Sequence, residues 1–274
     1  MLFYTFCVDI GKHSKEELVK CLDILLNSIH KNIKNYELIC FTNFEIKDIL
    51  PQYNIKYRKY YDNQIKKLYD NKWLNLSFNK INIYKDLYDE FNKDFIWIDL
   101  DTIICYDISY INDLSNVFIE NGGPCINKNL LFSNNNNITV PRNRYILGNF
   151  WKLNINLYNK LINTLDKIIK NNLKLRFDLQ DLYSYYVYIE NCGNINKLGI
   201  NIIGNNVKTT TINGLSIWDK NGNTHATLNG LNNLYIDNNV IRSKLYSNKE
   251  IHILSFTFNS LKKLYNTEKF NELF

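Results

Sequence analysis

The stretch FIWIDLDT, residues 95–102, decides the fold that this sequence predicts. Its first four residues are apolar and rich in aromatic and β-branched types, which is typical of a buried strand. Asp99 and Asp101 follow, and residues two apart point the same way in an extended backbone. We therefore expect both carboxylates to face one small volume at the carboxyl end of a strand, where open α/β sheets bind ligands. Such oxygen ligands suit Mg²⁺ or Mn²⁺.

The segments before this strand alternate between strand and helix patterns. Ser14-Lys15-Glu16-Glu17 is a capping box, and apolar residues at helical spacing follow it as far as Ile29. This alternation is typical of a parallel, doubly wound α/β sheet flanked by helices. Strands are predicted over 3–8, 38–42, 54–59 and 94–98, with helices over 18–29 and 79–91.

The second half of the chain is less regular. Gly-Gly-Pro and four consecutive Asn lie between residues 121 and 144, which predicts a long loop, mobile over a site. We find no internal repeat and no interdomain linker, and therefore expect one domain over residues 1–274. A strand is predicted over 117–119, helices over 156–171 and 179–189, short strands and loops after 191, and a closing helix over 261–270.

The composition limits the partners and the compartment. The net charge of +6 fits an anionic substrate or weak attraction to an anionic membrane surface, and it falls short of a nucleic-acid-binding signature. No apolar run is long enough to span a membrane, and the N-terminal residues lack the basic start and cleavage site of a signal peptide. The six Cys include no C-x-x-C pair, which predicts buried free thiols in a reducing compartment. We therefore expect a cytoplasmic protein without a transmembrane segment.

Several motifs carry a family resemblance. Trp73 and Lys80 precede WIDLDT at 97–102, and residues 72–113 thereby resemble the nucleotide-sugar glycosyltransferases of the GT-A fold. The resemblance implies a Rossmann-like sheet and a D-x-D motif that binds a metal. Three further stretches are loosely similar to its sugar-contacting strand, its acidic motif and its C-terminal metal-binding segment. They are YILGNFW at 145–151, DLQDL at 178–182 and EIHILSF at 250–256.

The resemblance implies a function and a set of site residues. The expected reaction is metal-dependent transfer of a sugar from a nucleotide-sugar, UDP-sugar by family analogy, to a glycan, protein or lipid acceptor. The expected cofactor is Mn²⁺ or Mg²⁺, and the nucleotide-binding half would span about 1–113 and the acceptor half about 114–274. The resemblance assigns metal binding to Asp99, Asp101 and His252, catalysis to Asp181 and then Asp178, and contact with the nucleotide or sugar to Phe6, Val8, Lys80, Leu100, Gly148 and Asn149.

Alternatives remain open at this stage. The family often has Phe-His-Gly where this chain has Phe256-Thr257-Phe258, so His225 is the reserve for His252 as third metal ligand. A haloacid-dehalogenase-type phosphohydrolase also places D-x-D after an apolar strand, with the first Asp as nucleophile. There the motif usually follows the first strand, whereas at least two strands are predicted before Asp99. The non-enzyme alternative is a degenerate transferase, which binds a sugar nucleotide or glycan without turnover.

Overall fold

The computed structural model describes residues 1–46, 53–61, 72–120, 128–141, 145–176, 179–204, 214–216, 231–244, 248–256 and 258–274. The chain forms two compact units. Unit 1 consists of residues 1–60, 98–113 and 203–274, and unit 2 of residues 61–97 and 114–202. These units do not follow the expected boundary near residue 113, because the C-terminal segment belongs to the same unit as the first sixty residues.

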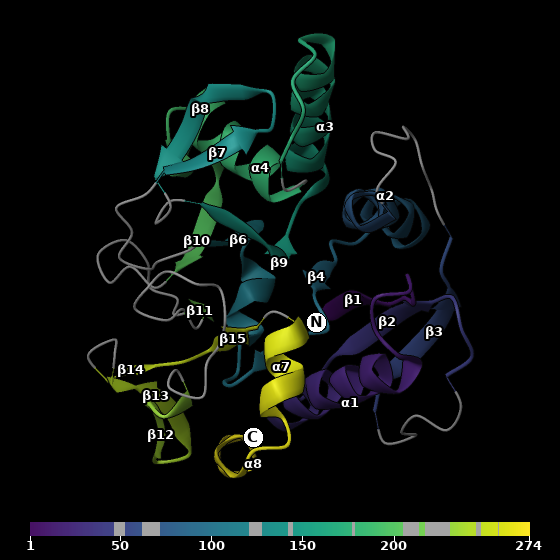
Figure 1. Cartoon of the computed structure of the whole chain (residues 1–274), viewed down its shortest axis with the longest axis vertical. Coiled ribbons are helices and arrows are strands. Elements are labelled where there is room, and N and C mark those ends of the chain that lie inside the picture. The colour runs from purple at the N-terminus through teal and green to yellow at the C-terminus, as the bar shows by residue number, and fades with distance from the viewer. Residues whose placement is uncertain are drawn as a thin grey trace. The chain divides into compact units, whose positions relative to one another are not determined.

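Unit 1 begins with a parallel β-α-β arrangement (Figure 1). The strands β1 (Leu2–Cys7), β2 (Glu37–Thr42) and β3 (Ile55–Lys59) lie side by side in that order. Most residues of β1 and β2 are buried, as expected for strands covered on both faces. All three strands were predicted from their apolar runs, and the structure confirms them within two residues.

The helix α1 (Lys15–Asn32) begins at the predicted capping box. The Ser14 hydroxyl accepts a hydrogen bond from the Glu17 N–H at 3.2 Å, and the Glu17 carboxylate accepts one from the Ser14 N–H at 3.0 Å. The helix buries one face, while its other face is polar. The buried face consists of Leu18, Cys21, Leu22, Leu25, Leu26, Ser28 and Ile29.

The remaining elements of unit 1 come from two distant parts of the sequence. A three-stranded sheet has the order β11-β15-β5, in which β5 (Thr102–Ile104) is antiparallel to β15 (Ile253–Ser255) and β15 is parallel to β11 (Gly214–Ser216). The predicted closing helix is two short helices, because Thr267 caps a new one. The other elements are η1 (Ser109–Asp113), β12 (Leu234–Asp237), β13 (Val240–Ser243), β14 (Lys249–Glu250), α7 (Phe258–Leu264) and α8 (Glu268–Leu273).

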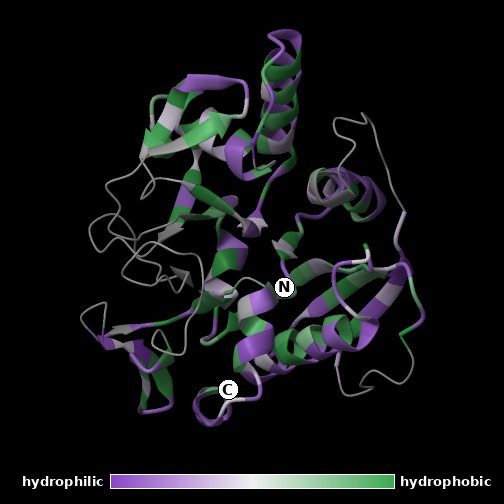
Figure 2. Ribbon diagram, in the orientation of Figure 1, coloured by the Kyte–Doolittle hydropathy of each residue, from purple (hydrophilic) through white to green (hydrophobic). Residues whose placement is uncertain are grey.

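Unit 2 combines long helices with strands. The amphipathic helix α3 (Ile155–Lys170) confirms the prediction, and Figure 2 shows its hydrophobic and hydrophilic residues alternating along the ribbon. The helix α2 (Lys72–Phe91) begins seven residues earlier than predicted. The other elements are β4 (Ile96–Ile98), whose last residue belongs to unit 1, β6 (Asn116–Glu120), β7 (Lys128–Phe132), β8 (Asn135–Pro141), β9 (Ile146–Lys152), α4 (Leu179–Ser184), the π-helical η3 (Tyr185–Glu190), α5 (Ile195–Leu198) and β10 (Ile200–Gly204), whose last two residues belong to unit 1.

The loop expected over 121–144 is wrong in its described part. Residues 128–141 form the antiparallel hairpin β7–β8, in which Leu131, Phe132 and Val140 are buried. The run of Asn hid this hairpin, since Asn is rare in strands and the apolar residues around it are few. The predicted 179–189 helix is helical throughout but changes from α to π geometry after Ser184.

The α/β class, with a mostly parallel sheet, is nevertheless as predicted. Seven strands form the largest sheet in the order β10-β6-β9-β4-β1-β2-β3, with β6 and β9 antiparallel. The chain is therefore an α/β protein with a mostly parallel central sheet and helices. None of the helices in the described ranges is both long and apolar enough to cross a membrane.

Candidate functional site

The two aspartates of the D-x-D motif lie in a tight turn rather than in an extended segment. β4 ends at Ile98 and β5 begins at Thr102, whose N–H donates to the Asp99 carbonyl at 3.2 Å. The extended backbone expected over 99–101 is therefore wrong, because the chain reverses there. Leu100 is buried, while Asp99 and Asp101 are partly exposed. The turn thus keeps both carboxylates within reach of solvent at the carboxyl end of a buried strand.

The C-terminal segment of unit 1 lies directly beside this turn. The Phe256 N–H donates to the Asp101 carbonyl at 2.9 Å, and Ser255 is the register partner of Thr102. At the other end of the pairing, the Cys105 N–H donates to the His252 carbonyl at 2.8 Å. Residues 250–256, which were expected to reach the D-x-D motif, therefore do lie beside it, but the residue that contacts Asp101 is Phe256.

His252 has a different set of neighbours. It lies opposite Cys105, four residues beyond Asp101, which at roughly 3.3 Å per strand residue is about 13 Å away. Its Nδ1 forms a 2.7 Å hydrogen bond with the Tyr110 hydroxyl, and its ring stacks on Tyr106 with the ring centroids 4.7 Å apart. Its Nε2 lies 3.7 Å from a Glu250 carboxylate oxygen. The structure thus places His252 in an aromatic and acidic cluster, and not beside Asp99 and Asp101.

Burial gives His252 a pH-dependent role in stability. Burial lowers its pKa below the usual 6.5, against the smaller raising effect of Glu250. The unfolded chain then binds a proton more readily, so His252 stabilises the fold above about pH 6.5, and that contribution is lost as the pH falls. The unfolding free energy of the wild-type protein, measured by urea denaturation, should fall between pH 7.5 and pH 5. We expect this fall to be smaller in His252→Gln.

The same titration needs a comparison with His13, whose pKa burial also lowers. His13→Gln should reduce the pH dependence in the same direction, and the double variant should reduce it further. A His252→Gln protein whose stability differs from wild type by the same amount at every pH would contradict the role given to burial.

The start of α1 meets the start of α7. The His13 ring stacks on Phe258 with the centroids 4.0 Å apart, and Lys262 forms an ion pair with Glu17. Burial, with the nearby Asp101 carboxylate as second cause, raises the pKa of the Cys21 thiol to about 12. The nearness of His13 to residue 258 depends on tertiary packing that no local sequence pattern records.

The end of β1 contributes buried side chains. Phe6 and Val8, expected at the nucleotide, are both buried, and the Phe6 ring packs edge-on against Tyr60 with the centroids 5.3 Å apart. Beyond the strand, the Asp9 N–H donates to the Asn43 side chain at 2.8 Å, which ties the loops after β1 and β2 together. Both predicted residues therefore help to build the core that holds these loops.

In unit 2, α4 packs closely on β9. Asp181 is fully buried and accepts a hydrogen bond from the Tyr145 hydroxyl at 2.8 Å, while the Ser184 hydroxyl accepts one from the Ile146 N–H at 2.9 Å. A Cβ added to Gly148 would lie 3.1 Å from the Gln180 side chain, so this glycine permits the close contact. The structure thus brings Gly148 and the helix bearing Asp181 together, although Asp178 lies outside the described residues.

Two other predicted residues of unit 2 have defined surroundings. The Lys80 ammonium lies 4.6 Å from the centroid of the Trp97 ring, a cation–π geometry. Asn149 has a buried side-chain oxygen for which the described residues supply no hydrogen-bond partner. In unit 1, the Arg242 guanidinium donates to Asp237 at 3.0 Å and to Glu250 at 3.2 Å, so its charge is balanced within the β12–β14 sheet. His225 lies outside the described residues.

The chemistry of the D-x-D turn suits a hard divalent cation. Carboxylates are ligands that Mg²⁺ and Mn²⁺ accept, and Mg²⁺ usually keeps several waters and takes only one or two carboxylates from the protein. Within the described ranges, no group of three or more His, Cys, Asp or Glu side chains is placed to hold a metal ion. The described residues therefore place no third His, Cys, Asp or Glu ligand beside Asp99 and Asp101.

Comparison with known proteins adds no family assignment. No protein-family model matches the chain, and no curated protein matches its sequence.

Proposed function

We propose that this chain is a metal-dependent glycosyltransferase that uses a nucleotide-sugar, a UDP-sugar in the first instance. The observation that carries the proposal is the D-x-D turn, which follows a fully buried strand of an α/β sheet and leaves both aspartates partly exposed. Carboxyl ends of such strands are where open α/β sheets bind ligands. The acceptor is a glycan, a protein or a lipid.

Asp99 and Asp101 would hold Mn²⁺ or Mg²⁺ against the donor diphosphate. The bound cation supplies positive charge where negative charge develops on the leaving nucleoside diphosphate. The turn contributes by holding the backbone that carries the two carboxylates. Its backbone is tied at both ends, by the Thr102 N–H on the Asp99 carbonyl and by the Phe256 N–H on the Asp101 carbonyl. Such support from neighbouring groups limits the movement of metal ligands.

The test is incubation of the purified chain with a panel of nucleotide-sugars and Mn²⁺, followed by detection of free sugar, nucleoside diphosphate or glycosylated acceptor. We expect hydrolysis or transfer from one donor, abolished by a chelator and restored by Mn²⁺. Release of phosphate from simple phosphomonoesters, without nucleotide-sugar turnover, would contradict the proposal in favour of a phosphohydrolase. Nucleotide-sugar binding without turnover on any acceptor would indicate the degenerate binding protein.

Asp181 is proposed as the acidic group that acts on the acceptor, with Asp178 as second choice. Asp181 is buried and accepts a hydrogen bond from Tyr145, so it could instead have a purely structural role. The two roles predict different losses of activity on substitution. If Asp181 acts as general base, Asp181→Asn should lower kcat by about 10²–10⁴-fold, the usual contribution of such a group. The loss should be much greater than for Tyr145→Phe, which removes the same hydrogen bond and keeps the carboxylate.

Thermal denaturation provides the control for this pair. Equal losses of activity and of Tm in Asp181→Asn and Tyr145→Phe would assign Asp181 to the packing of α4 on β9 and leave the catalytic role to another residue.

A further inference from the structure

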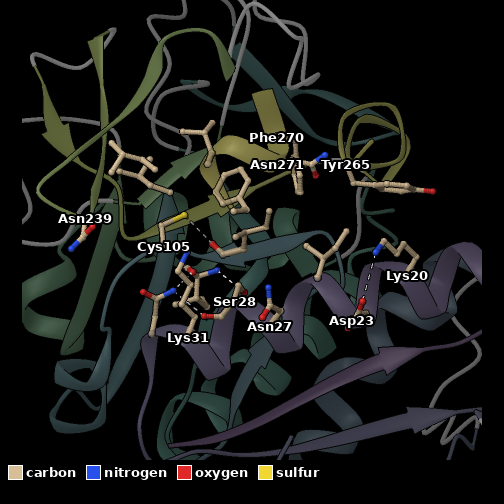
Figure 3. Close-up of a pocket in the computed structure, with 18 of the residues that line it drawn as sticks. Lys20, Asp23, Asn27, Ser28, Lys31, Cys105, Asn239, Tyr265, Phe270 and Asn271 are labelled. Atoms are coloured by element: carbon tan, nitrogen blue, oxygen red, sulfur yellow. Dashed lines mark hydrogen bonds and ion pairs between the residues drawn. The ribbon is translucent and has the colours of Figure 1, made fainter. Parts of the chain in front are cut away.

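Unit 1 contains a cavity that the proposed reaction does not use. It lies between α1, β5 and the C-terminal helix α8, and its volume is about 480 Å³ (Figure 3). Small-molecule sites in proteins usually enclose about 300–1,000 Å³. Neither Asp99 nor Asp101 lines the cavity. It is therefore a separate feature of the same unit, large enough for a small ligand.

The inner wall of the cavity is apolar. Ile103 and Ile104 of β5 form part of it, and Ile241 of β13 and Phe270 and Leu273 of α8 also line it. All five side chains are buried in the core and present only a small part of their surface. Figure 3 shows Phe270 on the α8 side, with Cys105 and Ser28 across from it. An alkyl chain would pack favourably against such a wall, since each methylene group that is removed from water adds to the binding affinity.

The rim along α1 is polar and carries positive charge. Lys20, Asp23, Asn27 and Lys31 line the cavity at helical spacing, so they form one stripe on the helix. The Lys20 ammonium lies 3.7 Å from the Asp23 carboxylate, which balances its charge. Among the described residues, no carboxylate pairs with Lys31. Lys31 is eleven residues from Lys20, about 16 Å along the helix, so it places at one end of the cavity a positive charge that no carboxylate of the described residues pairs with.

We propose that this cavity binds a single-chain amphiphile with an anionic head group, either a carboxylate or a phosphate. The alkyl chain would lie on the wall formed by β5, β13 and α8, and the head group would lie at the Lys31 end. This inference does not rest on the proposed transferase activity, because it uses neither the D-x-D turn nor any residue of unit 2.

The test is isothermal titration calorimetry of the full chain with octyl phosphate and decyl phosphate, both below their micelle-forming concentrations. Decyl phosphate should bind about tenfold more tightly than octyl phosphate, because two more methylenes are buried. Decanol and inorganic phosphate should each bind far more weakly than decyl phosphate. Equal affinity for the two alkyl phosphates would overturn the proposal.

Variants at exposed positions locate the site without threatening the fold. Lys31→Gln should weaken decyl phosphate binding about 1.5- to fivefold, the range typical of exposed ion pairs. Lys160→Gln, the same charge change on α3 of unit 2, should have no effect. Ile236→Ser, at a cavity-lining residue that is 50% exposed, should weaken decyl phosphate and reduce the preference for the longer chain. Equal effects of Lys31→Gln and Lys160→Gln would overturn the assignment.

Binding to lipid vesicles distinguishes a monomeric amphiphile in the cavity from a lipid head group at a membrane surface. Sedimentation with phosphatidylcholine vesicles, with and without phosphatidic acid, should show no retention that depends on Lys31, because the cavity encloses a monomeric chain. Binding to the anionic vesicles that Lys31→Gln abolishes, without binding of monomeric alkyl phosphates, would replace this proposal with a membrane-docking surface.

Discussion

Asn in place of Asp99 or Asp101 is expected to reduce Mn²⁺-dependent turnover of the nucleotide-sugar by about 10²–10³-fold, the loss typical when one electrostatic stabiliser is removed. The substitution keeps the shape of the side chain and removes the charge that attracts the cation. Since both carboxylates are partly exposed, the fold should tolerate the change. Initial rates at increasing Mn²⁺ concentration measure the effect, and the variants should also need more Mn²⁺ for half-maximal activity.

Asp113→Asn is the matched control for this experiment. Asp113 ends η1 in the same unit and is exposed, so the same loss of charge there should leave the rate unchanged. If both D-x-D variants kept full activity, or if Asp113→Asn lost as much, the reaction would not depend on a cation at this turn. A crystal soaked with UDP and Mn²⁺ should show the metal between Asp99 and Asp101.

Removal of the Trp97 ring should destabilise the protein by about 3–5 kcal/mol, as large-to-small changes of buried aromatic residues do. Trp97 is 1% exposed in β4, its ring stacks with Trp151 at a centroid distance of 6.3 Å, and Lys80 lies over it. Trp97→Ala therefore leaves a large cavity beside the strand that leads to Asp99. For a chain of this size the Tm should fall by roughly 5–9 °C.

Differential scanning calorimetry and urea denaturation measure this change. Trp97→Phe should lose much less, because a ring remains in the same place, and Tyr57→Ala, at a position 38% exposed, should change the unfolding free energy only slightly. A cost below 1 kcal/mol for Trp97→Ala would mean that β4 is not the buried strand described above.

Local patterns predicted the elements with strong periodicity. Each of these elements is indicated by residues that lie close together in the sequence. The structure confirms three of them: the strand before Asp99, the capping box at Ser14 and the helix over 155–170. The hairpin over 128–141 was missed because Asn masks its alternation. The turn at 99–102 was missed because an i to i+2 argument assumes an extended backbone, which the Thr102–Asp99 hydrogen bond excludes.

The candidate site was predicted in part, for a similar reason. Asp99 and Asp101 adjoin a recognisable strand, so their place at its carboxyl end followed from sequence alone. The position of His252 depends on the register of β15 against β5, which sets Phe256, and not His252, beside Asp101. Register is fixed by tertiary contacts between distant segments, and a single sequence contains no direct record of it. The same is true of the contact between His13 and Phe258.

The pairing of β5 with β15 also determines when the D-x-D turn can form. The partner of Thr102 is Ser255, which the ribosome adds about 150 residues later. Until then β5 lacks this neighbour, and the Asp101 carbonyl lacks the Phe256 N–H. Contacts between such distant residues slow folding, because a long loop must close before they stabilise the chain. The aspartate turn should therefore be among the last parts of unit 1 to become ordered, and a chain released before residue 256 should contain β1, α1 and β2 without an ordered turn.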